Sequence, residues 1–122
     1  MGKLKEVVWM GSSKEDLKEF PEDVQDAVGY ALYVIQLGDT PNCAKPFKIG
    51  KGSGAGVMEI VEDHDTNTYR AVYTVRFKDV VYVLHCFQKK SKHGIETPKH
   101  DVELVSTRLQ QAQADYRLWK GN

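Results

Sequence analysis

The chain has 122 residues, of which 41% are hydrophobic and 28% are charged. This length and mixture predict one folded domain over residues 1–122 and exclude a disordered or fibrous chain. Basic and acidic residues number 17 each, so the formal net charge is zero.

The charges are unevenly distributed along the chain. Residues 1–44 hold 4 lysines and 8 carboxylates, whereas residues 45–100 hold 10 basic and 6 acidic residues. An acidic first third and a basic middle indicate that one pole binds an anion and the other pole binds something else. The alternative is that these charges only cover a solvated surface.

The cytoplasm is the expected location. No apolar run approaches the roughly 20 residues that span a bilayer, and no apolar signal-peptide core follows the basic N-terminus. The two cysteines, Cys43 and Cys86, are too far apart in sequence to predict a zinc site or a redox motif. Two lone thiols fit a reducing compartment.

The chain opens with a predicted strand and a short helix. Val7–Met10 is a short apolar run typical of a strand. Ser12 and Glu15 have the spacing of a capping box, which predicts a helix that ends near Phe20.

A second, longer helix should follow directly. Pro21 suits its first turn, and Gly38 suits its C-terminal end. Between them, apolar residues recur at helical spacing and form one face: Val24, Ala27, Val28, Ala31, Leu32 and Ile35.

Three strands are predicted after a long loop at residues 38–56. Their expected ranges are 57–61, 69–77 and 80–87. The second strand alternates, and Lys78 and Asp79 form a tight hairpin connection to the third. The third strand is apolar throughout, so we expect it to be covered on both faces.

Thr97 and Pro98 should begin a last helix, whose apolar residues also recur at helical spacing. The predicted fold is α+β, in the order β-α-α-β-β-β-α. We expect a twisted, mainly antiparallel sheet of about four strands with the helices packed on one side.

Basic side chains should gather near the second and third of these strands. Arg70 and Arg76 are both at even positions of one strand, so alternation places them on the same face. The basic strand end at 87–93 hairpins back toward Arg70. Converging cations favour a phosphodiester ligand. The other predicted members of this cluster are Lys48, Lys51, Lys89, Lys90, Lys92 and His93.

Such a cluster could cleave RNA by activating its own 2′-hydroxyl. Lysine and arginine stabilise the charged pentacovalent phosphate, and histidine or lysine moves protons. No cofactor is expected, and the acids near this region show no carboxylate motif for a metal.

Simpler interpretations of these residues stay open. The lysines could be a solvated strand end, and Arg70 could be a cross-strand ion-pair partner. His85, inside an apolar run, is expected to be a hydrogen-bonded core histidine.

The sequence resembles the phage-related, Tad-like group of the RelE/HigB-like toxins. The resemblance covers residues 7–117 and is most specific in the stretch Tyr69–Tyr73 and in the stretch Val83–Lys92. Further matching segments are Trp9–Ser13, Phe20–Val24, Gly29–Leu32, Lys45–Lys48, Gly56–Ile60 and Thr97–Pro98.

The resemblance implies the toxin of a type II toxin–antitoxin pair, a metal-independent mRNA endonuclease that inhibits translation, often on the ribosome. It implies an antitoxin partner similar to helix-turn-helix repressors. Arg70 and Lys90 would stabilise the phosphate, and Lys89 and Lys48 would position the RNA backbone.

The proton-transfer residue is left open between Lys92 and His93, because RelE has a tyrosine where this chain has Gly94–Glu96. Arg76 is a lower-ranked candidate for an RNA contact, and Tyr73 could stack on RNA or position it. Lys51 could complete the rim of the basic cluster.

Two other functions remain compatible with this resemblance. ParE toxins of the same superfamily inhibit DNA gyrase without cutting nucleic acid, and fold alone does not separate the two classes. The basic cluster favours the nuclease. The third possibility is a non-toxic remnant that retains only antitoxin binding.

Overall fold

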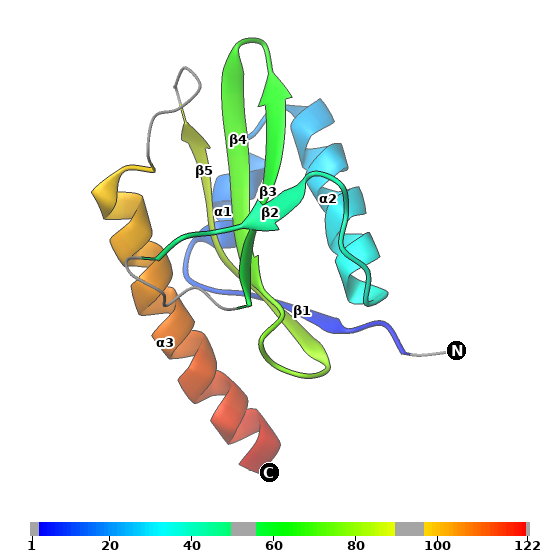
Figure 1. Cartoon of the computed structure of the whole chain (residues 1–122), viewed down its shortest axis with the longest axis vertical. Coiled ribbons are helices and arrows are strands. Elements are labelled where there is room, and N and C mark those ends of the chain that lie inside the picture. The colour runs from blue at the N-terminus through cyan, green and yellow to red at the C-terminus, as the bar shows by residue number, and fades with distance from the viewer. Residues whose placement is uncertain (1–2, 50–55, 90–96, 122) are drawn as a thin grey trace.

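The computed structural model describes residues 3–49, 56–89 and 97–121. Figure 1 shows the eight elements that these residues form. In chain order they are β1 (Glu6–Trp9), α1 (Ser13–Lys18), α2 (Glu22–Gln36), β2 (Ala44–Pro46), β3 (Val57–His64), β4 (Asn67–Thr74), β5 (Val80–Lys89) and α3 (Lys99–Gly121).

The strands form one mixed sheet in the order β1-β5-β4-β3-β2. β1 runs parallel to β5, and the other neighbouring strands are antiparallel. The α+β class and the mainly antiparallel sheet are therefore confirmed. The strand count is five rather than four, because the predicted loop contains the short edge strand β2.

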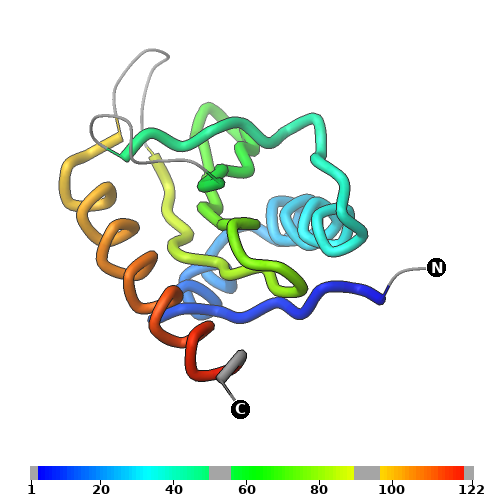
Figure 2. The backbone as a smooth tube through the Cα atoms, turned by 60° about the horizontal axis from the view of Figure 1, so that its bottom comes forward, coloured from blue at the N-terminus to red at the C-terminus, as the bar shows by residue number. Residues whose placement is uncertain are grey.

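The helices pack on both faces of the sheet, so the prediction of helices on one side was wrong (Figures 1 and 2). One core joins α2 to the sheet through buried residues such as Val28, Ile35 and Tyr73. The other core joins α3 to the opposite face through residues such as Val105 and Leu84. β5 contributes to both cores, as its continuous apolar run predicts.

A register shift interrupts the pairing of β4 with β5. Val72 pairs with His85, but Tyr73 pairs with Val83, so Leu84 is the extra residue of a β-bulge. From the bulge onward, each side chain of β5 points to the opposite face from the one that regular alternation along the strand would give it. His85 consequently lies on the face that α3 covers, together with Leu84 and Phe87.

The ends of the helices follow the sequence signals only in part. Ser12 makes no capping bond to a backbone N–H; its hydroxyl donates instead to Asp16 at 2.8 Å, so the capping box was wrong. Pro21 is the N-cap residue of α2 rather than a member of its first turn. Gly38 has a φ of 97° just after α2, which confirms it as the C-terminal stop.

Candidate functional site

Three cross-strand rows of side chains form the α3-covered face at the β3–β4 hairpin end of the sheet. Directly paired residues of antiparallel strands point to the same face. The pairing therefore gives the rows Glu59–Val72–His85, Val61–Arg70–Phe87 and Asp63–Thr68–Lys89. The five ionisable members of these rows, Glu59, Asp63, Arg70, His85 and Lys89, are called the β3–β5 patch below.

Arg70 lies in the middle of this patch. Its Nη1 donates a hydrogen bond to Oε1 of Glu59 at 2.7 Å, and both side chains are largely buried. Nε of Arg70 is also buried and has no hydrogen-bond acceptor among the described residues. Arg70 is therefore a cross-strand ion-pair partner, which agrees with the simpler interpretation of this residue.

His85 belongs to a network that connects β5 with α3. Its Nε2 lies 2.7 Å from Oδ1 of Asp101, and its Nδ1 lies 3.4 Å from Nη1 of Arg108. A guanidinium can only donate, so Nδ1 accepts and the ring proton on Nε2 is donated to Asp101. Both ring nitrogens are thus engaged, which confirms the prediction of a hydrogen-bonded core histidine.

Arg108 extends the same network to the turn between β1 and α1. It donates to the carbonyl oxygen of Leu84 at 3.0 Å and to the hydroxyl of Ser12 at 3.2 Å. Gly11 leaves room for the guanidinium, since a Cβ there would lie only 2.6 Å from Nε of Arg108. Three segments far apart in the sequence are held together beneath the patch by one side chain.

Lys89 occupies the last position of β5 and is buried, with 7% exposure. It pairs with Thr68, whose hydroxyl donates to Oδ1 of Asp63 at 2.9 Å. Lys89 and Arg70 point to the same face from adjacent strands. They are diagonal neighbours, which stand roughly 7–8 Å apart in antiparallel sheets.

Comparison with protein families finds a match over most of the chain. Residues 15–110 match the family described as phage-derived protein Gp49-like. The chain belongs to that family. A comparison with the curated proteins found no match.

Among solved structures, this Gp49-like chain is similar to a toxin–antitoxin component. That component is a chain of the toxin–antitoxin complex RelBE2 from Mycobacterium tuberculosis, with 18% sequence identity. The alignment covers 75% of this chain and 98% of that one, with a TM-score of 0.49.

Some predicted site residues of the Gp49-like chain meet at the patch. Arg70 and Lys89 do so directly. Lys48 follows β2 and is exposed, between Phe47 and Ile49, which pack into the α3-side core. The segment that carries Lys48 therefore lies over the same face as the patch.

Two predicted RNA contacts lie elsewhere. Tyr73 is 2% exposed in the core on the α2 side of the sheet, so its prediction as an RNA contact was wrong. Burial raises the pKa of Tyr73 to about 12. Arg76 lies beyond the end of β4 at Thr74, next to Gly56, so strand alternation does not carry it to the side of Arg70.

The remaining candidates, Lys51, Lys90, Lys92 and His93, lie outside the described residues. Sequence reasoning did not predict that Glu59 bonds Arg70, or that Asp101 and Arg108 bond His85. The pairing of Glu59 with Arg70 depends on the strand register. Arg108 did carry a signal, because it interrupts the apolar stripe of α3 between Val105 and Leu109.

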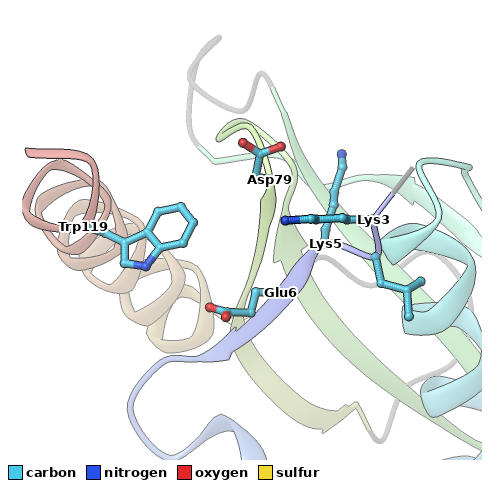
Figure 3. A pocket seen from close by; sticks show the side chains of 6 residues that line it. Lys3, Lys5, Glu6, Asp79 and Trp119 are labelled. Atoms are coloured by element: carbon cyan, nitrogen blue, oxygen red, sulfur yellow. The ribbon is translucent and has the colours of Figure 1, made fainter. Parts of the chain in front are cut away.

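A separate pocket of about 400 Å³ lies at the other end of α3. Figure 3 shows Trp119 on one side of it and Lys3 and Lys5 on the other. The rise of α3 places Trp119 roughly 27 Å from Asp101 beside the patch. Glu6 and Asp79 balance the two lysines, so this pocket offers no net charge to an anion.

The described part of the chain lacks two further features. No group of three or more His, Cys, Asp or Glu side chains there could hold a metal ion. None of the helices described is long and apolar enough to cross a membrane.

Proposed function

We propose that the chain is the toxin of a type II toxin–antitoxin pair. In this proposal it inhibits translation by cleaving mRNA, on the ribosome or free, and a helix-turn-helix antitoxin silences it. Two findings support the toxin assignment: the match to the Gp49-like family, which groups with RelE-type toxins, and the sequence resemblance over residues 7–117.

The observation that carries the nuclease proposal is the state of Arg70. It is a guanidinium held in the α3-side face by Glu59, with a buried Nε that lacks an acceptor among the described residues. The side chain of Arg70 is still 13% exposed, and a phosphate oxygen that reaches its guanidinium would gain a charge-assisted hydrogen bond. Lys89 in the adjacent row adds a second positive charge on the same face.

The chemistry that we propose needs no metal ion. Arg70 and Lys90 stabilise the pentacovalent phosphate that forms when the 2′-oxygen bonds to phosphorus, and Lys89 and Lys48 position the RNA backbone. The bond from phosphorus to the 5′-oxygen then breaks and leaves a 2′,3′-cyclic phosphate. The 2′-hydroxyl loses one proton in this reaction, and the leaving 5′-oxygen gains one. Proton transfer is assigned to Lys92 or His93. His85 has a supporting role here, because Asp101 and Arg108 occupy both of its ring nitrogens.

The test is inducible expression without antitoxin, with mapping of new 5′ ends in cellular mRNA. Arg70→Ala alone would leave the carboxylate of Glu59 buried without a partner, so the informative variant is Arg70→Gln combined with Glu59→Gln. Arg117→Gln, on the exposed surface of α3, is the matched control. Purified protein is assayed on RNA with a chelator present to test metal independence.

Growth arrest with new mRNA ends in the wild type and the control, but not in the double variant, is expected. Arrest with intact mRNA would contradict cleavage and redirect attention to gyrase. Absence of arrest from well-folded wild-type protein would contradict the toxin assignment and favour a remnant that only binds the antitoxin.

A further inference from the structure

α2 carries a second apolar face that points away from the sheet. Its inner face is buried in the α2-side core. On the outside, Tyr30, Tyr33, Val34 and Leu37 follow one another at helical spacing, and Tyr30 is 71% exposed. Apolar side chains that gather on an exposed face are typical of a surface that a partner covers.

A groove runs beside this outer face. It has a volume of about 470 Å³ and lies between α2 and the segment that follows it. Residues that line it include Ala27, Tyr30 and Val34 from α2, Pro41 and Cys43 from the following segment, and Glu62 from β3. A groove next to an exposed aromatic row can take an amphipathic helix, whose apolar side chains enter it at successive turns.

The charges around the groove indicate that the partner segment is basic. Five carboxylates and no lysine, arginine or histidine occur between Lys18 and Lys45. Asp23 and Asp26 are exposed on α2, and helical spacing aligns Asp26 with Tyr30. The last turn of α2 contains no basic residue to offset the negative end of the helix dipole. A basic segment therefore fits this surface, whereas RNA would be repelled.

We propose that the outer face of α2 and its groove dock a basic amphipathic helix of a partner protein. The identification of that partner as the antitoxin rests on the proposed function. The docking surface and the β3–β5 patch lie on opposite faces of the sheet. A helix docked on α2 therefore anchors the partner without occupying the RNA site.

The first test measures binding by the full chain and does not depend on toxicity. The probe is a fluorescent helical peptide with leucines at helical spacing and lysines elsewhere, and its counterpart has glutamate at every lysine. The test variant is Tyr30→Gln/Tyr33→Gln, and Leu118→Gln, at an exposed position of α3, is the matched control.

The lysine peptide should bind the wild type and the control with equal affinity, and should bind the Tyr30/Tyr33 variant at least about tenfold more weakly. The glutamate peptide should not bind. Asp23→Asn/Asp26→Asn should weaken binding about threefold and reduce its salt dependence. Equal binding of the lysine peptide to all variants, or of both peptides to the wild type, would overturn the docking surface.

The second test uses the co-expressed antitoxin and sedimentation of the chain alone. The Tyr30/Tyr33 variant should stay as toxic as the wild type but lose neutralisation. A wild type that binds the lysine peptide at α2 but is not toxic would contradict the proposed function and leave the docking surface standing. Self-association that the Tyr30/Tyr33 substitutions abolish would make a second copy of the chain the occupant, against the proposal.

Discussion

The ion pair between Arg70 and Glu59 makes a specific prediction for stability. Both side chains are largely buried, so removing one charge leaves the other buried without its partner. Arg70→Gln should lower the free energy of unfolding by about 3–5 kcal/mol. Glu59→Gln/Arg70→Gln should cost less than Arg70→Gln alone. Urea unfolding of the two single variants and the double variant measures the coupling, and additive effects would contradict a buried pair.

Gly11 is constrained more strongly than any other glycine for which the structure gives surroundings. Its φ is 52°, and a Cβ would meet the guanidinium of Arg108. Gly11→Ala should therefore destabilise the fold by about 1–3 kcal/mol through backbone strain and displacement of Arg108. Gly29→Ala is the control: a Cβ added there would meet no atom of another part of the structure within 4 Å, and alanine at this position of α2 should stabilise by about 0.5–1 kcal/mol. Urea unfolding compares the two, and equal losses would contradict this explanation.

At the scale of single residues, the sequence predicted the candidate site in part. Arg70 and Lys89 were found because basic residues stood on adjacent strands that return to the same point. Alternation correctly placed Tyr73 on the face of β4 opposite to Arg70, but its predicted role as an RNA contact was wrong. Alternation separates the two faces of a strand and does not say which of them meets RNA. The ion pair with Glu59 depends on the register between β3 and β4, which composition does not specify.

The β-bulge in β5 is the element that strand periodicity could not reveal. Residues 80–87 are almost all apolar, so they carry no alternation from which to detect a shift. A regular strand would place His85 on the same face as Val81 and Val83, which is the α2 side. The bulge instead turns His85 toward Asp101 on α3.

Leu84, the extra residue of this bulge, should contribute strongly to the α3-side core. It is fully buried, so Leu84→Ala should cost about 2–5 kcal/mol through lost burial and a cavity. Leu118→Ala, at a position that is 74% exposed, should change stability by less than about 0.5 kcal/mol. Thermal and urea unfolding of both variants provide the comparison. A small loss at Leu84 would mean that α3 packs loosely on the bulge.

Element order was predictable because strands, helices and turns each left a local signal. β2 escaped because the sequence Ala44-Lys45-Pro46 is too short to alternate, and it is defined by its pairing with β3. The one-sided arrangement of helices was wrong for a reason visible in β5. A strand that is apolar on both faces needs a cover on each, and α2 and α3 provide them.

The whole molecule should lose stability in alkaline solution. Burial raises the pKa of Cys86 from 9.0 to about 12, and burial also raises the pKa of Tyr73 from 10.0 to about 12. Desolvation raises the pKa of Tyr82 as well, and its hydrogen bond to Asp115 adds to the effect. The folded state holds these protons more tightly than the unfolded chain, so this stabilisation is complete below pH 9 and disappears as the pH rises toward 12.

Urea unfolding at about pH 8 and about pH 11 tests this expectation. Tyr73→Phe removes one of the titrating groups while keeping its ring, so the variant should lose less stability over that range than the wild type. A wild type with constant stability between the two conditions would contradict the assignment of these groups as buried and neutral.

The parallel pairing of β1 with β5 bears on how the protein folds as it is made. Glu6 pairs with Val80, so β1 gains its partner only after the two helices and three strands that lie between them in the sequence have been translated. Both helix-covered cores also need β5. A nascent chain therefore cannot complete its sheet one element at a time as it leaves the ribosome. Assembly of the β3–β5 patch therefore waits for β5 and for α3, whose Asp101 and Arg108 hold His85, so a nascent chain interrupted before α3 cannot present the complete patch.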